Sequence, residues 1–124
     1  MPFVSEWDNE AQTVYRIEFT DKWDWDTFTS EVLAVYRMIG ERDHNVDIIV
    51  GFMSPLPKGD ALHNLTYAGS KQPPNLKRTV FINQAGALLT AIVHTIATSR
   101  GYDGPKFVES VEEARYYLEE PVTW

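Results

Sequence analysis

The sequence contains no cysteine. Disulfide bonds, thiolate zinc sites and cysteine nucleophiles are therefore excluded. Histidine is also rare: His44 lies in a predicted turn, and His63 and His94 lie on different predicted helices, so no two of them have metal-ligand spacing. We predict neither a metal site nor a cofactor.

Positively charged residues are outnumbered in this chain. Eleven Lys and Arg residues stand against eighteen Asp and Glu residues, which gives a formal net charge of −7. Binding to nucleic acid or to an anionic membrane surface needs clustered basic side chains, and the sequence has no such cluster. The composition therefore disfavours both kinds of partner.

Long, purely apolar runs are absent as well. Residues 1–20 alternate apolar and charged side chains and lack the apolar core of a signal peptide. The most apolar stretch, 79–99, has no charged residue, but Asn83, Gln84, His94 and four threonines make it too polar for a membrane span. We expect a soluble, cytoplasmic protein.

The 124 residues, of which 44% are hydrophobic, are enough for one domain that covers 1–124 around a single core. Two segments, "PFVSEWD" (2–8) and "TVYRIEFT" (13–20), alternate apolar and polar residues and predict a β-hairpin. From Asp24, a suitable N-cap, the period changes to three and four residues and predicts a helix. The expected inner face of that helix consists of Trp25, Phe28, Val32, Val35, Tyr36 and Ile39.

The rest of the chain alternates strands with helices. The apolar run "VDIIVGFM" (46–53) predicts a strand covered on both faces. Ser110 and Glu113 form a capping box that opens the last helix. Further strands are predicted at 78–83 and 106–110, and further helices at 61–69, at 85–99 and after Ser110. The apolar residues of helix 61–69 are Ala61, Leu62, Leu65 and Ala68. The expected inner face of the last helix consists of Ala114, Tyr117 and Leu118. The order ββαβαβαβα predicts an α/β fold with a mostly parallel five-stranded sheet, four helices and an antiparallel first strand.

Four segments carry a resemblance to a known family: "YRIEFTDKWDWDTF" (15–28), "VDIIVGF" (46–52), "PPNLKRTVFIN" (73–83) and "KFVESVEEARYYL" (106–118). In this order they resemble the STAS domain family, the fold of sporulation anti-anti-sigma factors, and its branch of uncharacterised bacterial proteins. The resemblance covers nearly the whole chain and implies a regulatory, protein-interaction module. The wider fold includes the CRAL-TRIO lipid-carrying proteins, which gives the alternative function of a small carrier or sensor for an apolar, lipid-like ligand.

The resemblance also raises a question about the segment that follows strand 46–53. In anti-anti-sigma factors the matching strand leads to an Asp-Ser-Ser-Gly-like motif, whose serine at a helix start is phosphorylated by a partner kinase. Here the matching residues, 58–61, read Lys-Gly-Asp-Ala and carry no hydroxyl, and Ser54 comes several residues too early. We therefore predict that the usual phosphoacceptor is absent. An anion could bind the free N–H groups of this helix start, but Asp60 would repel it and is a good N-cap, so we favour a plain cap.

Polar residues follow two neighbouring predicted strands. Ser54 and Lys58 come after strand 46–53, and Asn83 and Gln84 come at the end of strand 78–83. Parallel strands end at one edge of the sheet, where open α/β sheets bind ligands, so these four residues are the candidate ligand site. The alternative is that they only satisfy turns.

The "WDWD" segment (23–26) places two tryptophans beside two carboxylates. It could bind a sugar or a cationic group, but we favour Trp25 in the core, Trp23 over the sheet end and the aspartates as caps. The chain shows neither converging carboxylates and histidines nor a G-x-S-x-G motif, and we predict that it is not an enzyme.

The predicted helix 85–99 has no charged residue, although a helix on a sheet surface usually has a charged outer face. We predict that it forms a homodimer interface. The apolar stripe consists of Leu88, Leu89, Ile92, Val93 and Ile96. The alternatives are cover by the tail "EEPVTW" (119–124) or a lid over a cavity for an apolar ligand.

Overall fold

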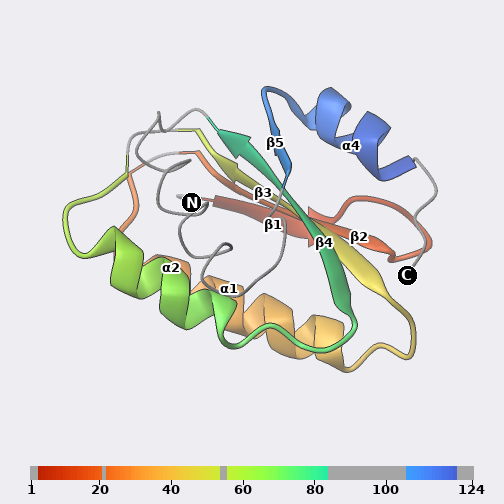
Figure 1. Ribbon diagram of the computed structural model, residues 1–124, viewed down its shortest axis with the longest axis horizontal. Coiled ribbons are helices and arrows are strands. Elements are labelled where there is room, and N and C mark those ends of the chain that lie inside the picture. Colours follow the sequence, from red (N-terminus) through yellow and green to blue (C-terminus); the bar gives the residue numbers. More distant parts are fainter. Residues whose placement is uncertain (1–2, 21, 54–55, 84–105, 120–124) are drawn as a thin grey trace.

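The computed structural model describes residues 3–20, 22–53, 56–83 and 106–119, which form one mixed sheet with helices on both faces (Figure 1). The strands are β1 (Phe3–Trp7), β2 (Val14–Phe19), β3 (Val46–Phe52), β4 (Leu76–Asn83) and β5 (Lys106–Val108). They lie in the order β1-β2-β3-β4-β5. Strand β1 is antiparallel to β2, and every other neighbouring pair is parallel, as the sequence predicted.

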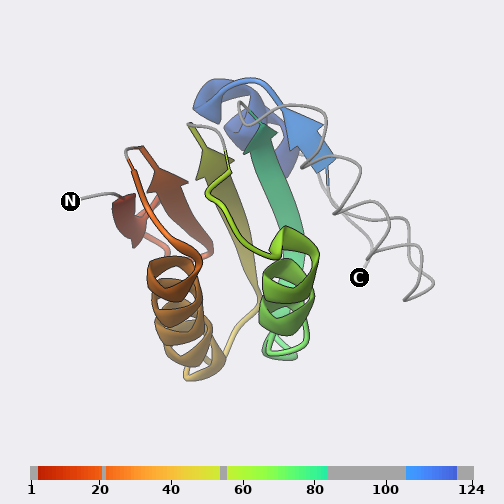
Figure 2. The ribbon, with the colours of Figure 1, turned by 90° about the vertical axis from the view of Figure 1, so that its left-hand side faces the viewer.

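Three helices lie in the described part of the chain: α1 (Trp25–Gly40), α2 (Ala61–Gly69) and α4 (Val111–Glu119). Helices α1 and α2 cover one face of the sheet and contact each other, and α4 lies on the opposite face (Figure 2). Successive right-handed crossovers between adjacent parallel strands place their helices on the same face, which explains the position of α1 beside α2. The fourth predicted helix, 85–99, lies outside the described residues. None of the described helices has the length and apolar character needed to cross a membrane.

Helix α1 follows the predicted pattern closely. The Asp24 carboxylate accepts a hydrogen bond from the Thr27 N–H at 2.7 Å and caps the helix start. At the other end, the Asn75 side chain donates to the carbonyl oxygens of Ile39 at 2.7 Å and His44 at 3.0 Å. The buried residues of α1 are the six predicted ones, Trp25, Phe28, Val32, Val35, Tyr36 and Ile39.

Strand β3 separates two apolar clusters, and all seven of its residues are buried. The larger cluster lies between the sheet and helices α1 and α2 and includes Ile48, Val50 and Phe52. The smaller cluster lies under α4 and includes Ile49 and Ala114. The alternation of side chains along β3 therefore supplies both cores, as expected for a strand covered on both faces.

Two details could not be read from the sequence pattern. Leu62, one of the four apolar residues named for α2, is 48% exposed, whereas Leu65 and Ala68 are buried. In the capping box, Ser110 Oγ accepts the Glu113 N–H at 3.1 Å as predicted, but the Glu113 carboxylate accepts its hydrogen bond from Glu109 N–H.

Candidate functional site

The candidate ligand residues were placed at the carboxyl edge of the parallel strands, and the structure describes two of them. Lys58 is exposed in the connection between β3 and α2. Asn83 ends β4 in register with Phe52, the last residue of β3. Ser54 and Gln84 lie outside the described residues, so convergence of the four side chains stays a prediction. The predicted interface residues Leu88, Leu89, Ile92, Val93 and Ile96 also lie outside the described residues.

The start of α2 is built as an ordinary cap. The Asp60 carboxylate accepts the His63 N–H at 2.9 Å, and the Asn64 side chain donates to the Asp60 carbonyl oxygen at 2.8 Å. The carboxylate thus occupies the position that an anion would need, which supports the N-cap interpretation. Lys58 and Gly59, just before the cap, are exposed.

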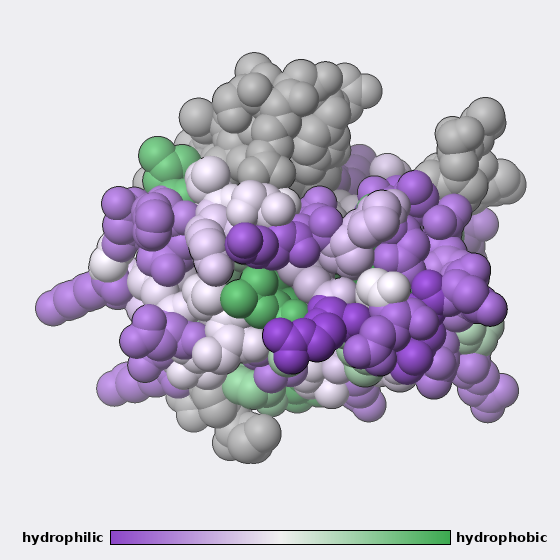
Figure 3. All heavy atoms as spheres, turned by 90° about the horizontal axis from the view of Figure 1, so that it is seen from below, coloured by the Kyte–Doolittle hydropathy of each residue, from purple (hydrophilic) through white to green (hydrophobic). Residues whose placement is uncertain are grey.

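The outer face of α2 carries no charged side chain, because the whole helix, "ALHNLTYAG", contains no Asp, Glu, Lys or Arg. Leu62 is 48% exposed and Tyr67 43% exposed, and His63 and Thr66 lie exposed beside them. We call these four residues the α2 surface. Figure 3 views the molecule from the side of α1 and α2, where hydrophilic residues surround near-neutral ones and a small apolar area.

A shallow groove of about 370 Å³ separates α2 from α1 and adjoins the α2 surface. Its lining mixes apolar surface with hydroxyl and amide groups and includes the carboxylate of Asp26. The lining residues are Asp26, Thr29 and Ser30 of α1 and His63, Asn64 and Tyr67 of α2. The groove and the α2 surface together offer apolar contact and hydrogen-bonding groups in one place, with one carboxylate, Asp26, at the groove.

The "WDWD" segment packs as we favoured from the sequence. Trp23 is 8% exposed and Trp25 6% exposed, and both belong to the larger core. The hydrogen bond that Asp24 accepts from the Thr27 backbone lowers the pKa of its carboxyl. Both indole nitrogens are buried without a hydrogen-bond partner. Nothing in the sequence pattern indicated this, because spacing predicts burial but not the partners of a buried atom.

The opposite, amino edge of the parallel strands has a polar pocket of about 430 Å³ that the sequence did not reveal. It lies between the starts of β2, β3 and β4 and the end of α4. Its lining includes two carboxylate–guanidinium pairs, Asp8 with Arg115 and Asp47 with Arg78. The pocket is therefore bordered by the contacts that fasten α4 to the sheet.

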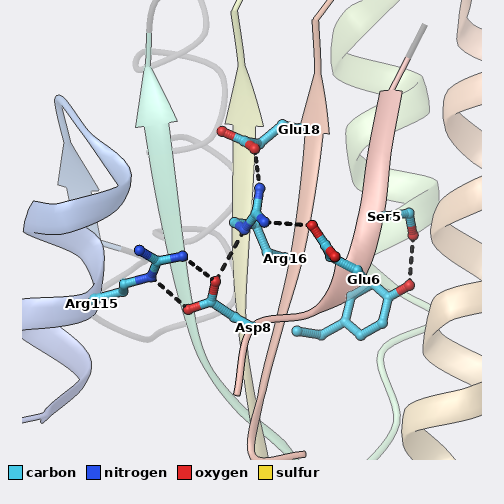
Figure 4. A network of polar contacts seen from close by, with 7 residues as sticks. Ser5, Glu6, Asp8, Arg16, Glu18 and Arg115 are labelled. Atoms are coloured by element: carbon cyan, nitrogen blue, oxygen red, sulfur yellow. Dashed lines mark hydrogen bonds and ion pairs between the residues drawn. The ribbon is translucent and has the colours of Figure 1, made fainter. Parts of the chain in front are cut away.

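Asp8 is the centre of a network on the sheet face that α4 covers in part (Figure 4). It accepts two hydrogen bonds from Arg115, at 2.7 and 2.9 Å, and one from Arg16, at 3.1 Å. Arg16 also pairs with Glu6 and Glu18. The hydrogen bonds from Arg115 are the largest cause of a lowered pKa of the Asp8 carboxyl, which outweighs the opposing effect of burial.

Asp47 is the buried charged residue of the described part of the chain, at 7% exposure. Its carboxylate accepts hydrogen bonds from the Arg78 backbone N–H and from the guanidinium, each at 2.9 Å. Arg78 also donates to the carbonyl oxygen of Leu118 at 3.1 Å. A charged residue inside an apolar strand needs a partner, so the isolated aspartate of "VDIIVGF" was the signal that could have identified a buried ion pair here.

The residues that the structure describes include no group of three or more His, Asp and Glu side chains placed to hold a metal ion. His44 Nε2 lies 2.8 Å from the Gln12 carbonyl oxygen, a hydrogen bond that raises the pKa of the imidazole. This histidine links two turns.

Comparisons with family models, with curated proteins and with solved structures found no match to this chain. Its function must therefore be argued from the sequence and the geometry of the sites described above.

Proposed function

We propose that this protein is a non-enzymatic, STAS-like interaction module that binds a regulatory protein partner through the α2 surface. The observation that carries the proposal is the uncharged, exposed outer face of α2, which follows directly on strand β3 and the Lys58–Ala61 segment. In the family that the sequence resembles, the same position meets the regulatory kinase. Because Lys58–Ala61 has no hydroxyl, the interaction proposed here does not depend on phosphorylation at that segment.

The chemistry of the α2 surface suits a protein partner. The centres of protein interfaces are depleted in charged residues and enriched in tyrosine, and α2 exposes Leu62 and Tyr67 and has no charged residue of its own. The Lys71 ammonium lies 5.4 Å from the centroid of the Tyr67 ring. The adjoining groove supplies hydroxyl and amide groups for hydrogen bonds at the rim. An apolar centre with a polar edge is the usual anatomy of such an interface.

The use of the carboxylates supports a non-enzymatic role. Asp24 and Asp60 cap helices, and Asp8 and Asp47 are held in ion pairs with arginines. The pKa of Asp8 is lowered, whereas a general acid at neutral pH needs a raised one. These four carboxylates therefore act as structural anions.

A matched pair of tyrosines tests the α2 surface. Tyr67 on α2 is 43% exposed, and Tyr116 on α4, on the other face of the sheet, is 69% exposed. A partner captured from the source cells and identified by mass spectrometry is purified and titrated against each variant by calorimetry. We expect Tyr67→Asp to weaken binding by at least about 30-fold, as for an interface hot spot, and Tyr116→Asp to leave it unchanged. Equal affinity of both variants for that partner would show that α2 is not the binding surface.

We also propose that the protein is a homodimer through residues 85–99, whose apolar stripe is Leu88, Leu89, Ile92, Val93 and Ile96. The support is the absence of any charged side chain from that stretch. Native mass spectrometry should give a dimer for the wild type and for Tyr67→Asp, and a monomer for Ile92→Asp. A monomeric wild type, or a dimeric Ile92→Asp variant, would contradict this interface and leave the α2 proposal to its own test.

A further inference from the structure

Two buried tryptophans leave their only polar atoms unused. Trp23 Nε1 and Trp25 Nε1 are both buried without a hydrogen-bond partner, and the two rings lie edge to face with centroids 5.1 Å apart. Most buried polar groups in native proteins have a partner, and an unpartnered one calls for a specific explanation. Packing alone does not explain these, because phenylalanine would supply an aromatic ring without the N–H.

Both indoles lie at the carboxyl edge of the parallel strands. Trp23 contacts Phe19 and Phe52, the last residues of β2 and β3, with ring centroids 4.9 and 5.6 Å apart. Trp25 is the first residue of α1. In open α/β sheets this edge is where ligands bind.

Trp25 lies directly beneath an exposed residue without a side chain, Gly59. A Cβ at position 59 would lie 2.9 Å from Trp25 Cδ1 and 3.4 Å from Nε1, and Gly59 has a φ of +125° that other residues rarely adopt. At position 59 the connection between β3 and α2 thus covers this indole edge with backbone only. A displacement of Gly59 on ligand binding would open the nitrogen to a ligand.

We propose that Trp23 and Trp25 are the hydrogen-bond donors of a binding site for a neutral, largely apolar small molecule with a carbonyl-type oxygen. An indole N–H only donates, so the ligand must accept. Asp24, Asp26 and Asp60 lie at the starts of the two neighbouring helices and disfavour an anionic ligand.

Aromatic side chains of the neighbouring strands would contact the apolar part of the ligand. The ring of Phe52 stacks on Phe81 at 6.0 Å, and Phe81 stacks on Phe107 at 5.5 Å. Phe81 and Phe107 are only half-buried and continue the aromatic row from Trp23 towards β5. This inference goes beyond the interaction module and does not depend on it.

Nuclear magnetic resonance of the ¹⁵N-labelled full chain tests the site directly. The three probes are methyl octanoate, octane, which lacks the acceptor, and octanoate, which is charged. We expect methyl octanoate to shift the indole N–H resonances of Trp23 and Trp25 downfield. Trp7, which packs on Tyr15 at the end of β1 away from this edge, should not shift and is the internal control. Octane and octanoate should shift the two resonances much less.

Conservative variants then separate a binding role from packing. We expect Trp23→Phe and Trp25→Phe each to weaken methyl octanoate about tenfold, the usual effect of one lost hydrogen bond, and Trp7→Phe to leave the affinity unchanged. Three outcomes would overturn the proposal. Octane could bind as well as methyl octanoate, or the Trp7 resonance could shift as much as those of Trp23 and Trp25. The third outcome is magnetisation transfer from the indoles to ordered water, with no response to any probe. The titration of the wild-type protein tests whether the two indoles bind methyl octanoate even if a variant does not fold.

Discussion

The buried pair of Asp47 and Arg78 gives the sharpest test of how the sheet and α4 are held together. Their side chains are 10% and 16% exposed, and Asp47→Asn removes the charge while changing little else. Removing one partner of a buried ion pair costs about 3–5 kcal/mol. The asparagine keeps an acceptor for the Arg78 N–H, and the guanidinium keeps the Leu118 carbonyl oxygen, so the expected loss is at the low end, about 3 kcal/mol.

Urea unfolding followed by circular dichroism measures this loss, which corresponds to a fall of about 10 °C in Tm for a domain of this size. Asp43→Asn is the matched control, since it makes the same chemical change on a side chain that is fully exposed at 103%, and it should change the free energy of unfolding by less than about 0.5 kcal/mol. Arg78→Met added to Asp47→Asn should destabilise by less than the sum of the single variants, because the two residues interact. Equal losses for the two asparagine variants would refute the assignment of a buried, stabilising pair.

Three further variants test separate features, each by the free energy of unfolding. Ser110→Ala removes the side-chain cap of α4 and should cost about 1 kcal/mol, so no loss would contradict the cap. Because Arg115 lowers the pKa of Asp8, their stabilising contact is fully present above about pH 3.9, the unfolded-state value of an aspartate, and is lost as the pH falls through the lower folded-state pKa. Asp8→Asn should therefore flatten the loss of stability below about pH 4, and an unchanged loss of stability in acid would count against the contact. Gly59→Ala forces a Cβ into a left-handed position 2.9 Å from Trp25 and should cost about 1–3 kcal/mol with a change in tryptophan fluorescence, whereas a silent substitution would show that the contact is loose.

Local pattern was enough to predict most of the described elements. The spacing of Trp25, Phe28 and Val32 identified the buried face of α1, because a helix that covers a sheet needs one apolar stripe at that period. The unbroken apolar run of β3 identified a strand buried on both faces. The pattern did not show which apolar residues of α2 would be exposed, because in a helix of nine residues it is too short to fix the orientation of the stripe, and Leu62 is 48% exposed.

Polar contacts between distant segments could not be predicted in the same way. Asp8 and Arg115 are 107 residues apart, and no spacing rule joins them. Strand β1 lies at the far edge of the sheet from β5, and Arg115 reaches Asp8 because α4 lies back across the sheet face against β4 and β3. That placement is decided by packing of the whole chain rather than by any local signal. The absence of hydrogen-bond acceptors for Trp23 and Trp25 could not be predicted either, because a periodicity that predicts burial contains no information about hydrogen bonds.

The two edges of the parallel strands differ in whether their polar groups already have hydrogen-bond partners. This difference indicates which edge is structural and which edge we propose to bind a ligand. At the amino edge the carboxylates of Asp8 and Asp47 are already paired with arginines, so a ligand in the 430 Å³ pocket would compete with charge-assisted hydrogen bonds that hold α4 in place. At the carboxyl edge the indole N–H groups of Trp23 and Trp25 have no acceptor, so a ligand oxygen that reaches them displaces no existing hydrogen bond of either indole. The polar pocket at the amino edge is therefore structural, and the small-molecule site that we propose lies at the aromatic edge, where no ion pair has to be broken.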